Sequence, residues 1–272
     1  MESGRLARMN RLANRILRFS AWLALVGVES ASADNWRPPP GATIQIQYTG
    51  ATIETGVVAD IYNLDLFETP PELIAALHAQ GRRVICYLSV GTLEDWRPDV
   101  AAFLPDVVGD AYPGWPGERW LDLRAIDRLV PAMTGRLDLA KAKRCDGIDP
   151  DNLDGYETAT GFPLSSADTV AFMRWLSGAA RGRGLGIGLK NGADLWPDLA
   201  DAVDWVLIED CAAQGWCGVM KQARAAGLAV FQVEYTDAGL DWQDVCRKAA
   251  EMGFSAILKN RKLDSYRVGC RE

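Results

Sequence analysis

Acidic side chains stand directly after short apolar runs at several points along this sequence. Asp149, Asp151 and Asp154 follow one run, Glu209 follows a second, and Glu234 follows a third. Two carboxyl groups on either side of a bond can protonate a leaving oxygen and stabilise a cationic, sugar-like transition state. Strand ends also meet water, so any single acid here has a simpler interpretation as a solvated charge. The repetition of acids after several apolar runs favours a cleft lined by carboxylates.

The composition narrows the chemistry further. The chain of 272 residues has 29 Lys and Arg against 36 Asp and Glu, a net charge of −7. This charge argues against nucleic acid or anionic lipid as a partner. His78 is the single histidine, so the chain lacks the residues for a multi-histidine metal site or for a choice of histidine bases. We therefore expect carboxylate chemistry without a metal or a cofactor.

Two segments resemble ligand-binding loops but lack what those loops need. The acidic segment that begins at Asp149 has Leu153 at position five and Thr160 at position twelve, where a calcium loop needs oxygen ligands and a final Glu. The glycine-rich segment 182–188 follows a predicted helix and leads into a strand, the reverse of the order in a phosphate-binding loop. We interpret it as a helix-to-strand turn.

The apolar runs have the length and spacing of strands in a parallel α/β fold. Pro70-Pro71 begins a helix between two of them, and Ser165 or Ser166 with Asp168 caps another. Eight strand–helix units in about 240 residues favour a single-domain α/β fold, the (β/α)8 TIM barrel, whose active site lies at the carboxyl ends of the strands. The expected strands are 43–48, 58–63, 83–89, 147–151, 186–191, 205–209, 230–235 and 255–259, with a short extra strand at 120–123.

Residues 1–33 have the pattern of a secretory signal peptide. Five arginines precede the apolar run Phe19–Val28 and the small residues Ala31-Ser32-Ala33. A run of about ten apolar residues is too short for a membrane-spanning helix, which needs about 20. We expect cleavage after Ala33, which leaves a catalytic domain of residues 34–272 with 24 Lys and Arg against 34 Asp and Glu, a net charge of −10. The protein is then secreted or periplasmic, without stable membrane insertion.

Six cysteines remain after residue 33, and export permits disulfides. We predict bridges Cys211–Cys217 and Cys246–Cys270, because the first pair is close in sequence and the second ties the last helix to the tail. Cys86 and Cys145 are interpreted as small buried side chains. Six cysteines allow 15 full pairings, so the sequence leaves the connectivity open.

Eight short motifs stand in order along the chain, most of them at the ends of the expected strands. They are DIYNLDLF (60–67), VICYLSVG (84–91), EDWRPD (94–99), ERWLD (118–122), CDGIDPDNLDGY (145–156), GLKN (188–191), EDC (209–211) and VEY (233–235). Together they resemble one known family, glycoside hydrolase family 114, the endo-α-1,4-polygalactosaminidases. The resemblance runs from about Trp36 to the C-terminus.

The resemblance implies a secreted (β/α)8 enzyme without a cofactor that cuts α-1,4-linked galactosamine polymers internally. The family's catalytic Asp and Glu match Asp151 and Glu209. We favour a retaining reaction with Asp151 as nucleophile and Glu209 as acid/base, although the two roles are interchangeable at this stage. Asp210 departs from the family's Gln, and its charge either raises the pKa of Glu209 or points outward.

Further polar and aromatic residues near the strand ends are candidates for binding a cationic galactosamine-containing polysaccharide. Lys190 is suited to holding Asp151 ionised. Trp96, Trp115 and Trp120 are candidate sugar platforms, or else fillers of the core. The predicted substrate-binding residues are Asp65, Tyr87, Glu94, Asp149, Asp154, Tyr156, Lys190, Asn191, Glu234 and Tyr235.

Two other functions fit the same residues. One is a hydrolase or transferase acting on another α-linked amino-sugar polymer. The other is a non-catalytic polysaccharide-binding barrel, which has no need for the matched pair Asp151 and Glu209. We expect a monomer in either case.

Overall fold

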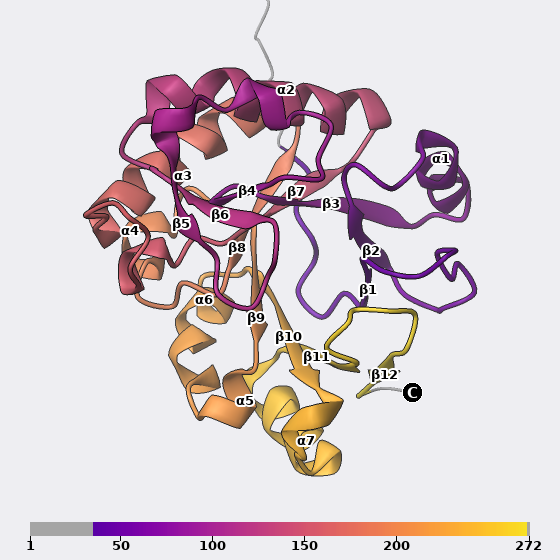
Figure 1. Ribbon diagram of the computed structural model, residues 1–272. Coiled ribbons are helices and arrows are strands. Elements are labelled where there is room, and N and C mark those ends of the chain that lie inside the picture. Colours follow the sequence, from indigo (N-terminus) through magenta and orange to yellow (C-terminus); the bar gives the residue numbers. More distant parts are fainter. Residues whose placement is uncertain (1–34, 271–272) are drawn as a thin grey trace, which may run out of the picture. The chain divides into compact units, whose positions relative to one another are not determined.

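The computed structural model describes residues 35–270, in which eight parallel strands follow one another in sequence order around a curled sheet (Figure 1). All eight overlap the predicted apolar runs, although β2 begins three residues later and ends two residues later than predicted, and the (β/α)8 class is confirmed. Their bounds are β1 (Ile44–Gln47), β2 (Ile61–Asp65), β3 (Arg83–Ser89), β7 (Gly147–Asp151), β8 (Gly186–Lys190), β9 (Trp205–Glu209), β10 (Ala229–Tyr235) and β11 (Ser255–Lys259).

The segment after β11 bridges the last parallel strand and the first. The carbonyl of Leu263 accepts a hydrogen bond from the amide of Tyr48 at 2.9 Å, and Arg267 donates to the carbonyl of Ile44 at 2.8 Å. Strand β12 (Val268–Gly269) then pairs antiparallel with β11. The tail therefore holds β11 and β1 on the same side of the barrel.

Helices lie outside the sheet, but they are fewer and shorter than the predicted eight units. No helix of residues 35–270 separates β1 from β2, and three of the helices have only four or five residues. The predicted starts are confirmed at Pro71 and at Ser165, whose side chain forms a capping box with Asp168. The α-helices are α1 (Pro71–Ala79), α2 (Ile126–Lys143), α3 (Ser166–Arg181), α4 (Trp196–Leu199), α5 (Cys211–Gln214), α6 (Lys221–Ala225) and α7 (Trp242–Met252). The 3₁₀ helices are η1 (Val100–Ala102), η2 (Pro105–Val107), η3 (Gly155–Glu157), η4 (Cys217–Met220) and η5 (Thr236–Ala238).

A three-stranded antiparallel sheet interrupts the barrel between β3 and α2. It consists of β4 (Thr92–Glu94), β5 (Val108–Ala111) and β6 (Glu118–Leu121), in the order β4-β6-β5. The predicted strand at 120–123 overlaps β6, whereas β4 and β5 were not foreseen. This small sheet carries Glu94 and Glu118 directly opposite each other.

Two apolar cores hold the barrel together. One lies between the sheet and the helices, and the other lies in the interior of the barrel. Trp205 is completely buried in the inner core. A side-chain carbon at Gly147, Gly186 or Gly188 would lie within 3 Å of its indole, so glycines on the two preceding strands make room for this ring. No helix of the described residues is long and apolar enough to cross a membrane.

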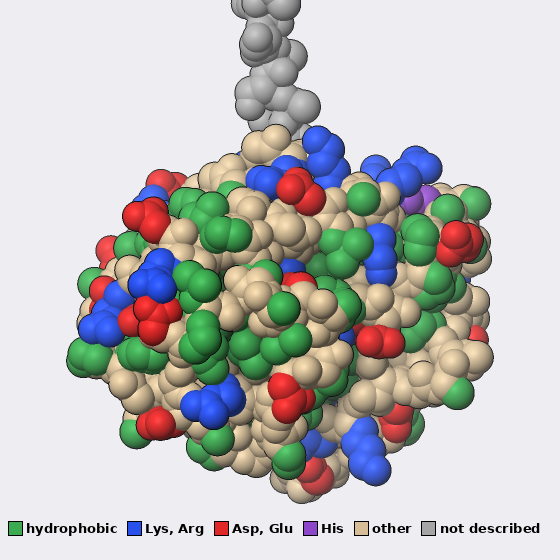
Figure 2. Space-filling view, turned by 45° about the horizontal axis from the view of Figure 1, so that its top comes forward, with side chains coloured by type: hydrophobic (Ala, Val, Ile, Leu, Met, Phe, Trp, Pro, Cys, Tyr) green, Lys and Arg blue, Asp and Glu red, His purple; other side chains and the backbone are tan. Residues whose placement is uncertain are grey.

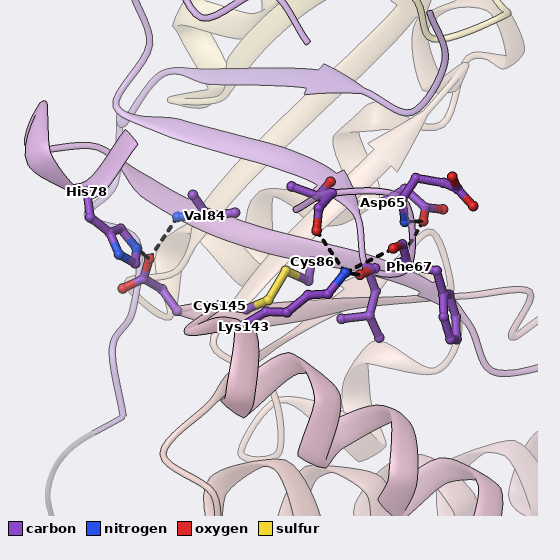
Figure 3. The surroundings of a disulfide bond; sticks show 11 residues. Asp65, Phe67, His78, Val84, Cys86, Lys143 and Cys145 are labelled. Carbon is purple, nitrogen blue, oxygen red and sulfur yellow. Dashed lines mark hydrogen bonds and ion pairs between the residues drawn. A yellow bond between two sulfur atoms is a disulfide. The ribbon is translucent and has the colours of Figure 1, made fainter. Parts of the chain in front are cut away.

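Three disulfides link the six cysteines of the described residues. Cys211–Cys217 and Cys246–Cys270 were predicted. The interpretation of Cys86 and Cys145 as separate buried side chains was wrong, because they form the third bridge, with Cα atoms 5.9 Å apart (Figure 3). Cys86 lies in β3 and Cys145 just before β7, and the parallel pairing of these strands brings together residues 59 positions apart.

Candidate active site

A cavity of about 1000 Å³ opens at the carboxyl ends of the parallel strands. Its walls come from β2, β3, β7, β8, β9 and β10 and from the antiparallel sheet. Of the predicted site residues, it is lined by Asp65, Tyr87, Glu94, Asp151, Asp154, Tyr156, Lys190, Asn191, Glu209 and Tyr235. The same mouth that sequence reasoning assigned to the strand ends thus gathers ten of the twelve predicted residues.

Lys190 lies between the two predicted catalytic carboxylates. Its Nζ is 3.1 Å from an oxygen of Asp151 and 3.3 Å from an oxygen of Glu209. Burial acts to lower the pKa of Lys190, but the surrounding acidic groups, with Asp151 and Glu209 the strongest, together outweigh it and hold the pKa well above its usual value. The ammonium group, also placed over the ring of Tyr87 at 5.1 Å, therefore stays charged and holds the two acids near each other.

Glu209 is positioned at both its backbone and its side chain. Its amide donates to Oδ1 of Asn191 at 2.9 Å, and Asn191 has the left-handed backbone (φ 53°) that lets the chain turn at the end of β8. The hydroxyl of Tyr235 donates to the second carboxylate oxygen of Glu209. Burial first, and then the charge of Glu209, raise the pKa of Tyr235, so its hydroxyl remains a donor.

Asp149 does not line the cavity but is fully buried behind it. One of its oxygens accepts hydrogen bonds from Asn63 at 2.8 Å and from Tyr48 at 3.2 Å, and the other has no partner. Burial raises its pKa to about 6, against the lowering effects of Lys190 and Asn63. Since side chains alternate along β7, Asp149 and Asp151 both point into the barrel, with Asp149 one layer deeper. The predicted substrate contact of Asp149 is therefore not supported.

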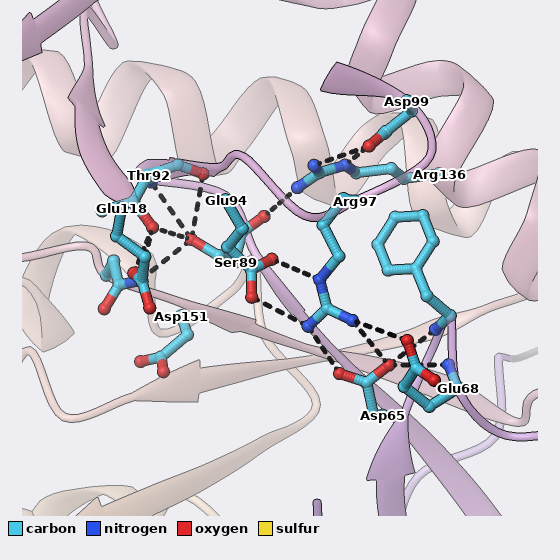
Figure 4. Close-up of polar contacts among 12 residues, drawn as sticks. Asp65, Glu68, Ser89, Thr92, Glu94, Arg97, Asp99, Glu118, Arg136 and Asp151 are labelled. Atoms are coloured by element: carbon cyan, nitrogen blue, oxygen red, sulfur yellow. Dashed lines mark hydrogen bonds and ion pairs between the residues drawn. The ribbon is translucent and has the colours of Figure 1, made fainter. Parts of the chain in front are cut away.

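Asp65 and Glu94 lie on the cavity wall, but both carboxylates are bound to one arginine (Figure 4). The guanidinium of Arg97 reaches Asp65 at 3.0 and 2.6 Å and Glu94 at 2.9 and 2.8 Å. Two bidentate pairs satisfy all the oxygens of these acids and neutralise part of their charge. Their role is to build the wall rather than to offer free carboxylates.

Glu234 is the other predicted residue outside the cavity. It is completely buried and accepts hydrogen bonds from the amide of Ala212 at 2.7 Å and from Gln232 at 2.9 Å, so it holds the start of α5. It lies close to Cys211 and Cys217, but the sulfurs are bonded to each other and offer no thiolate to a metal.

The aromatic candidates fall into two groups. Trp96 and Trp115 line the cavity and are about half exposed, which suits sugar platforms, whereas Trp120 is buried and belongs to the core. Tyr156 donates to Asp194 at 2.8 Å across the cavity rim. Tyr48 and Trp216 also line the cavity and were not predicted, since neither stands in a strand-end acid motif.

The additional acid Asp210 is neutralised by an arginine that lies after β11, two strands along the sheet from β9. Arg261, which follows β11, contacts both oxygens of Asp210 at 2.8 and 3.1 Å and also Asp237. The guanidinium of Arg261 lies 4.2 Å from the ring centre of Tyr235, which in turn contacts Glu209. Asp210, which also lines the cavity, is thus held in an ion pair directly after β9.

Glu118 is the cavity residue that sequence reasoning noted only as part of a motif. It lies in β6 of the antiparallel sheet and lines the cavity, and Thr92 donates to one of its oxygens at 2.9 Å. Burial, with the charges of Glu94 and Asp151, raises its pKa to about 7, although Thr92 and Arg97 act in the opposite direction. Its position depends on the antiparallel sheet, whose strands β4 and β5, of three and four residues, are too short to be recognised in the sequence.

Comparison with known proteins gives a consistent result. The crystal structure of Aspergillus fumigatus Ega3 in complex with galactosamine is 35% identical, covers 86% of this chain and 97% of its own, and superposes with a TM-score of 0.81. The glycoside hydrolase domain of PelA from Pseudomonas aeruginosa, at 16% identity, 83% and 97% coverage and a TM-score of 0.66, has the same fold. An uncharacterised protein of Deinococcus radiodurans is 26% identical over 229 residues, 76% of this chain and 73% of its own. A family model for glycoside-hydrolase family GH114 matches residues 27–272, so this chain is a glycoside hydrolase and belongs to family GH114.

Proposed function

We propose that this glycoside hydrolase cleaves α-1,4-linked galactosamine polymers internally and with retention of anomeric configuration. The observation that carries the mechanism is the position of Lys190 between Asp151 and Glu209. The sum of its two contact distances, 6.4 Å, is the upper limit for the separation of the two contacting carboxylate oxygens. Retaining glycosidases hold their carboxyl groups about 5–5.5 Å apart and inverting ones about 6.5–9.5 Å, so this limit favours retention.

In the proposed reaction, Asp151 attacks the anomeric carbon while the bond to the leaving oxygen breaks and Glu209 gives that oxygen a proton. Water then attacks the glycosyl–Asp151 ester, and Glu209 takes a proton from it. Lys190 donates a hydrogen bond to Asp151 at 3.1 Å, which holds this carboxylate in place for the attack. Tyr235 orients Glu209 through its hydroxyl.

The substrate class rests on similarity and on charge. The solved relative Ega3 was crystallised with galactosamine, a cationic sugar. Without residues 1–33 this chain has a net charge of −10, which attracts a polycation. The proposed signal peptide, residues 1–33, lies outside the described residues, and the three disulfides of the remaining domain suit an exported protein. We accordingly assign it to the secreted or periplasmic space, as a monomer.

The test is hydrolysis of partially deacetylated α-1,4-galactosaminan by residues 34–272, compared with Asp151→Asn and Glu209→Gln. We expect internal cleavage by the wild type, at least a thousandfold loss in each variant, and unchanged melting temperatures. Proton NMR of the first product gives its anomeric configuration. Binding without cleavage by the wild type would refute the proposed substrate, and an inverted first product would refute the assignment of Asp151 as nucleophile.

A further inference from the structure

Glu118 is a nearly buried carboxyl group with one unoccupied oxygen at the cavity. The residue is 8% exposed, and Thr92 donates to one of its two oxygens. The other oxygen accepts no hydrogen bond from residues 35–270 and is not among their fully enclosed unpaired atoms, so it is reachable from the cavity. Figure 4 shows this carboxylate and that of Asp151 facing the same space.

The groups around Glu118 leave its charge uncompensated. Glu94, across the strand pair in β4, and Asp151, at the end of β7, are both acids. Arg97 is the cation of this group, and its guanidinium is already bound to Glu94 and Asp65. Tyr87 and Tyr112, on which the charge of Glu118 also acts, have pKa values raised mainly by burial and stay neutral.

The position of Glu118 is held by a hydrogen-bond network rather than by an ion pair. Thr92 contacts Ser89 at 2.6 Å, and Asn152 donates to both residues at 2.9 Å. This network joins β6 to the ends of β3 and β7, where Asp151 lies. The carboxylate is therefore fixed relative to the proposed nucleophile while lacking a cationic partner.

We propose that Glu118 binds the ammonium group of a galactosamine unit in the cavity and selects a free amine over an N-acetyl group. This inference rests on the proposed function, since it names the group of that substrate that the site recognises. An ammonium supplies both the positive charge and the N–H donors that the open oxygen lacks. An N-acetyl group carries no charge and places a methyl beside two acids, which leaves the carboxylate desolvated and unpaired.

The assignment has a pH signature with a definite sign. Protonation of Glu118 below about pH 7 removes the negative charge that attracts the amine. The KM for a deacetylated substrate should then rise as the pH falls through this region. The chemistry itself uses Asp151 and Glu209, so kcat should follow a different profile.

The experiment compares Glu118→Gln with wild type, because glutamine has the same shape and can still accept from Thr92. Asp110→Asn, an exposed acid of the same sheet outside the cavity, is the matched control for loss of one charge. With deacetylated α-1,4-galactosamine oligomers at pH 8 we expect a KM about tenfold higher in Glu118→Gln, kcat within twofold, and no step in KM near pH 7. Asp110→Asn should match the wild type.

A binding measurement separates this inference from the proposed function. Calorimetry with Asp151→Asn, alone and combined with Glu118→Gln, gives the affinity for deacetylated and N-acetylated oligomers without turnover. We expect Glu118→Gln to weaken binding of the deacetylated oligomer only. Equal affinities with and without Glu118→Gln would overturn the role of Glu118 even if hydrolysis is observed. Failure of the wild type to cleave either oligomer would overturn the proposed function, while the affinities still decide the role of Glu118.

Discussion

At the scale of single residues, the site depends on one buried cation between two acids. Removing the charge in Lys190→Met leaves Asp151 and Glu209 facing each other without a counter-ion, and like charges at this separation raise the pKa of one of them. We expect kcat to fall about a hundredfold or more and the acidic limb of the pH–rate profile to move to higher pH. Lys141→Met, an exposed lysine of α2 away from the cavity, is the control. An unshifted profile in Lys190→Met would contradict the role given to the lysine.

Tyr235 makes a second single-residue contribution, through one hydroxyl group. Tyr235→Phe removes the hydrogen bond to Glu209 but keeps the ring on which Arg261 lies. A hydrogen bond to a charged group contributes about 1.5–3 kcal/mol, so we expect kcat/KM to fall roughly ten- to a hundredfold with little change in melting temperature. The comparison is Tyr266→Phe, at an exposed position. If both variants retain full activity, Tyr235 does not orient the acid/base.

The placement of site residues was predictable where it depends on strand ends alone. Asp151, Lys190 and Glu209 each end or follow an apolar run, and parallel strands bring such positions to one mouth. The engagement of Asp65 and Glu94 by Arg97 was not predictable, because it depends on the path of the chain between β3 and α2. Glu234 lies outside the cavity, against the start of α5, because its side chain alternates away from the cavity along β10.

At the scale of elements, the antiparallel insertion is held to the barrel by a close approach of two backbones. A side-chain carbon at Gly91 would lie 1.5 Å from the carbonyl oxygen of Asn152. Gly91→Ala must therefore push β4 away from β7 and disturb the network that holds Glu118. We expect a loss of about 3 kcal/mol in the free energy of unfolding, together with a higher KM. Denaturant titration and steady-state kinetics measure the two effects.

The matched control is Gly135→Ala, because a side-chain carbon there meets nothing within 4 Å. Gly135 lies inside α2, where alanine is favoured over glycine by roughly 0.5–1 kcal/mol. This variant should therefore be slightly more stable and fully active. Equal stability of Gly91→Ala and wild type would show that the two segments can separate freely.

The sequence analysis did not name the long helix α2, which begins without a side-chain cap, and the other elements that it missed are short. Strands β4 and β5 have three and four residues, and helices α4 and α5 have four each, too few for a hydrophobic period to become visible. The eight barrel strands were recognisable because continuous apolar runs are typical of strands buried on both sides. The pattern of apolar residues thus predicts the strands of the barrel well and the short elements inserted between them poorly.

At the scale of the whole molecule, acidic and basic side chains are interspersed over the face in Figure 2, so the acidic surplus forms no continuous patch there.

The three disulfides act on the entire chain by restricting its unfolded state. Loops of 59, 24 and 6 residues correspond to about 4, 3.5 and 2 kcal/mol. Replacing each pair by alanine should lower the melting temperature in that order, with Cys86–Cys145 most important. The reverse order in calorimetry would show that local packing outweighs chain entropy.

Stability of the whole molecule should also fall as pH rises across the range in which its buried acids ionise. Asp149 and Glu118 have pKa values raised from 3.8 to about 6 and from 4.5 to about 7, so the folded state binds more protons than the unfolded one between about pH 4 and 7. Linkage then makes each group contribute roughly 1–3 kcal/mol less at pH 8 than at pH 4. Melting curves across this range should flatten in Asp149→Asn and in Glu118→Gln, because neither amide ionises. An unchanged pH slope in both variants would mean that these carboxyl groups ionise at ordinary values and that the cavity is better solvated than its geometry indicates.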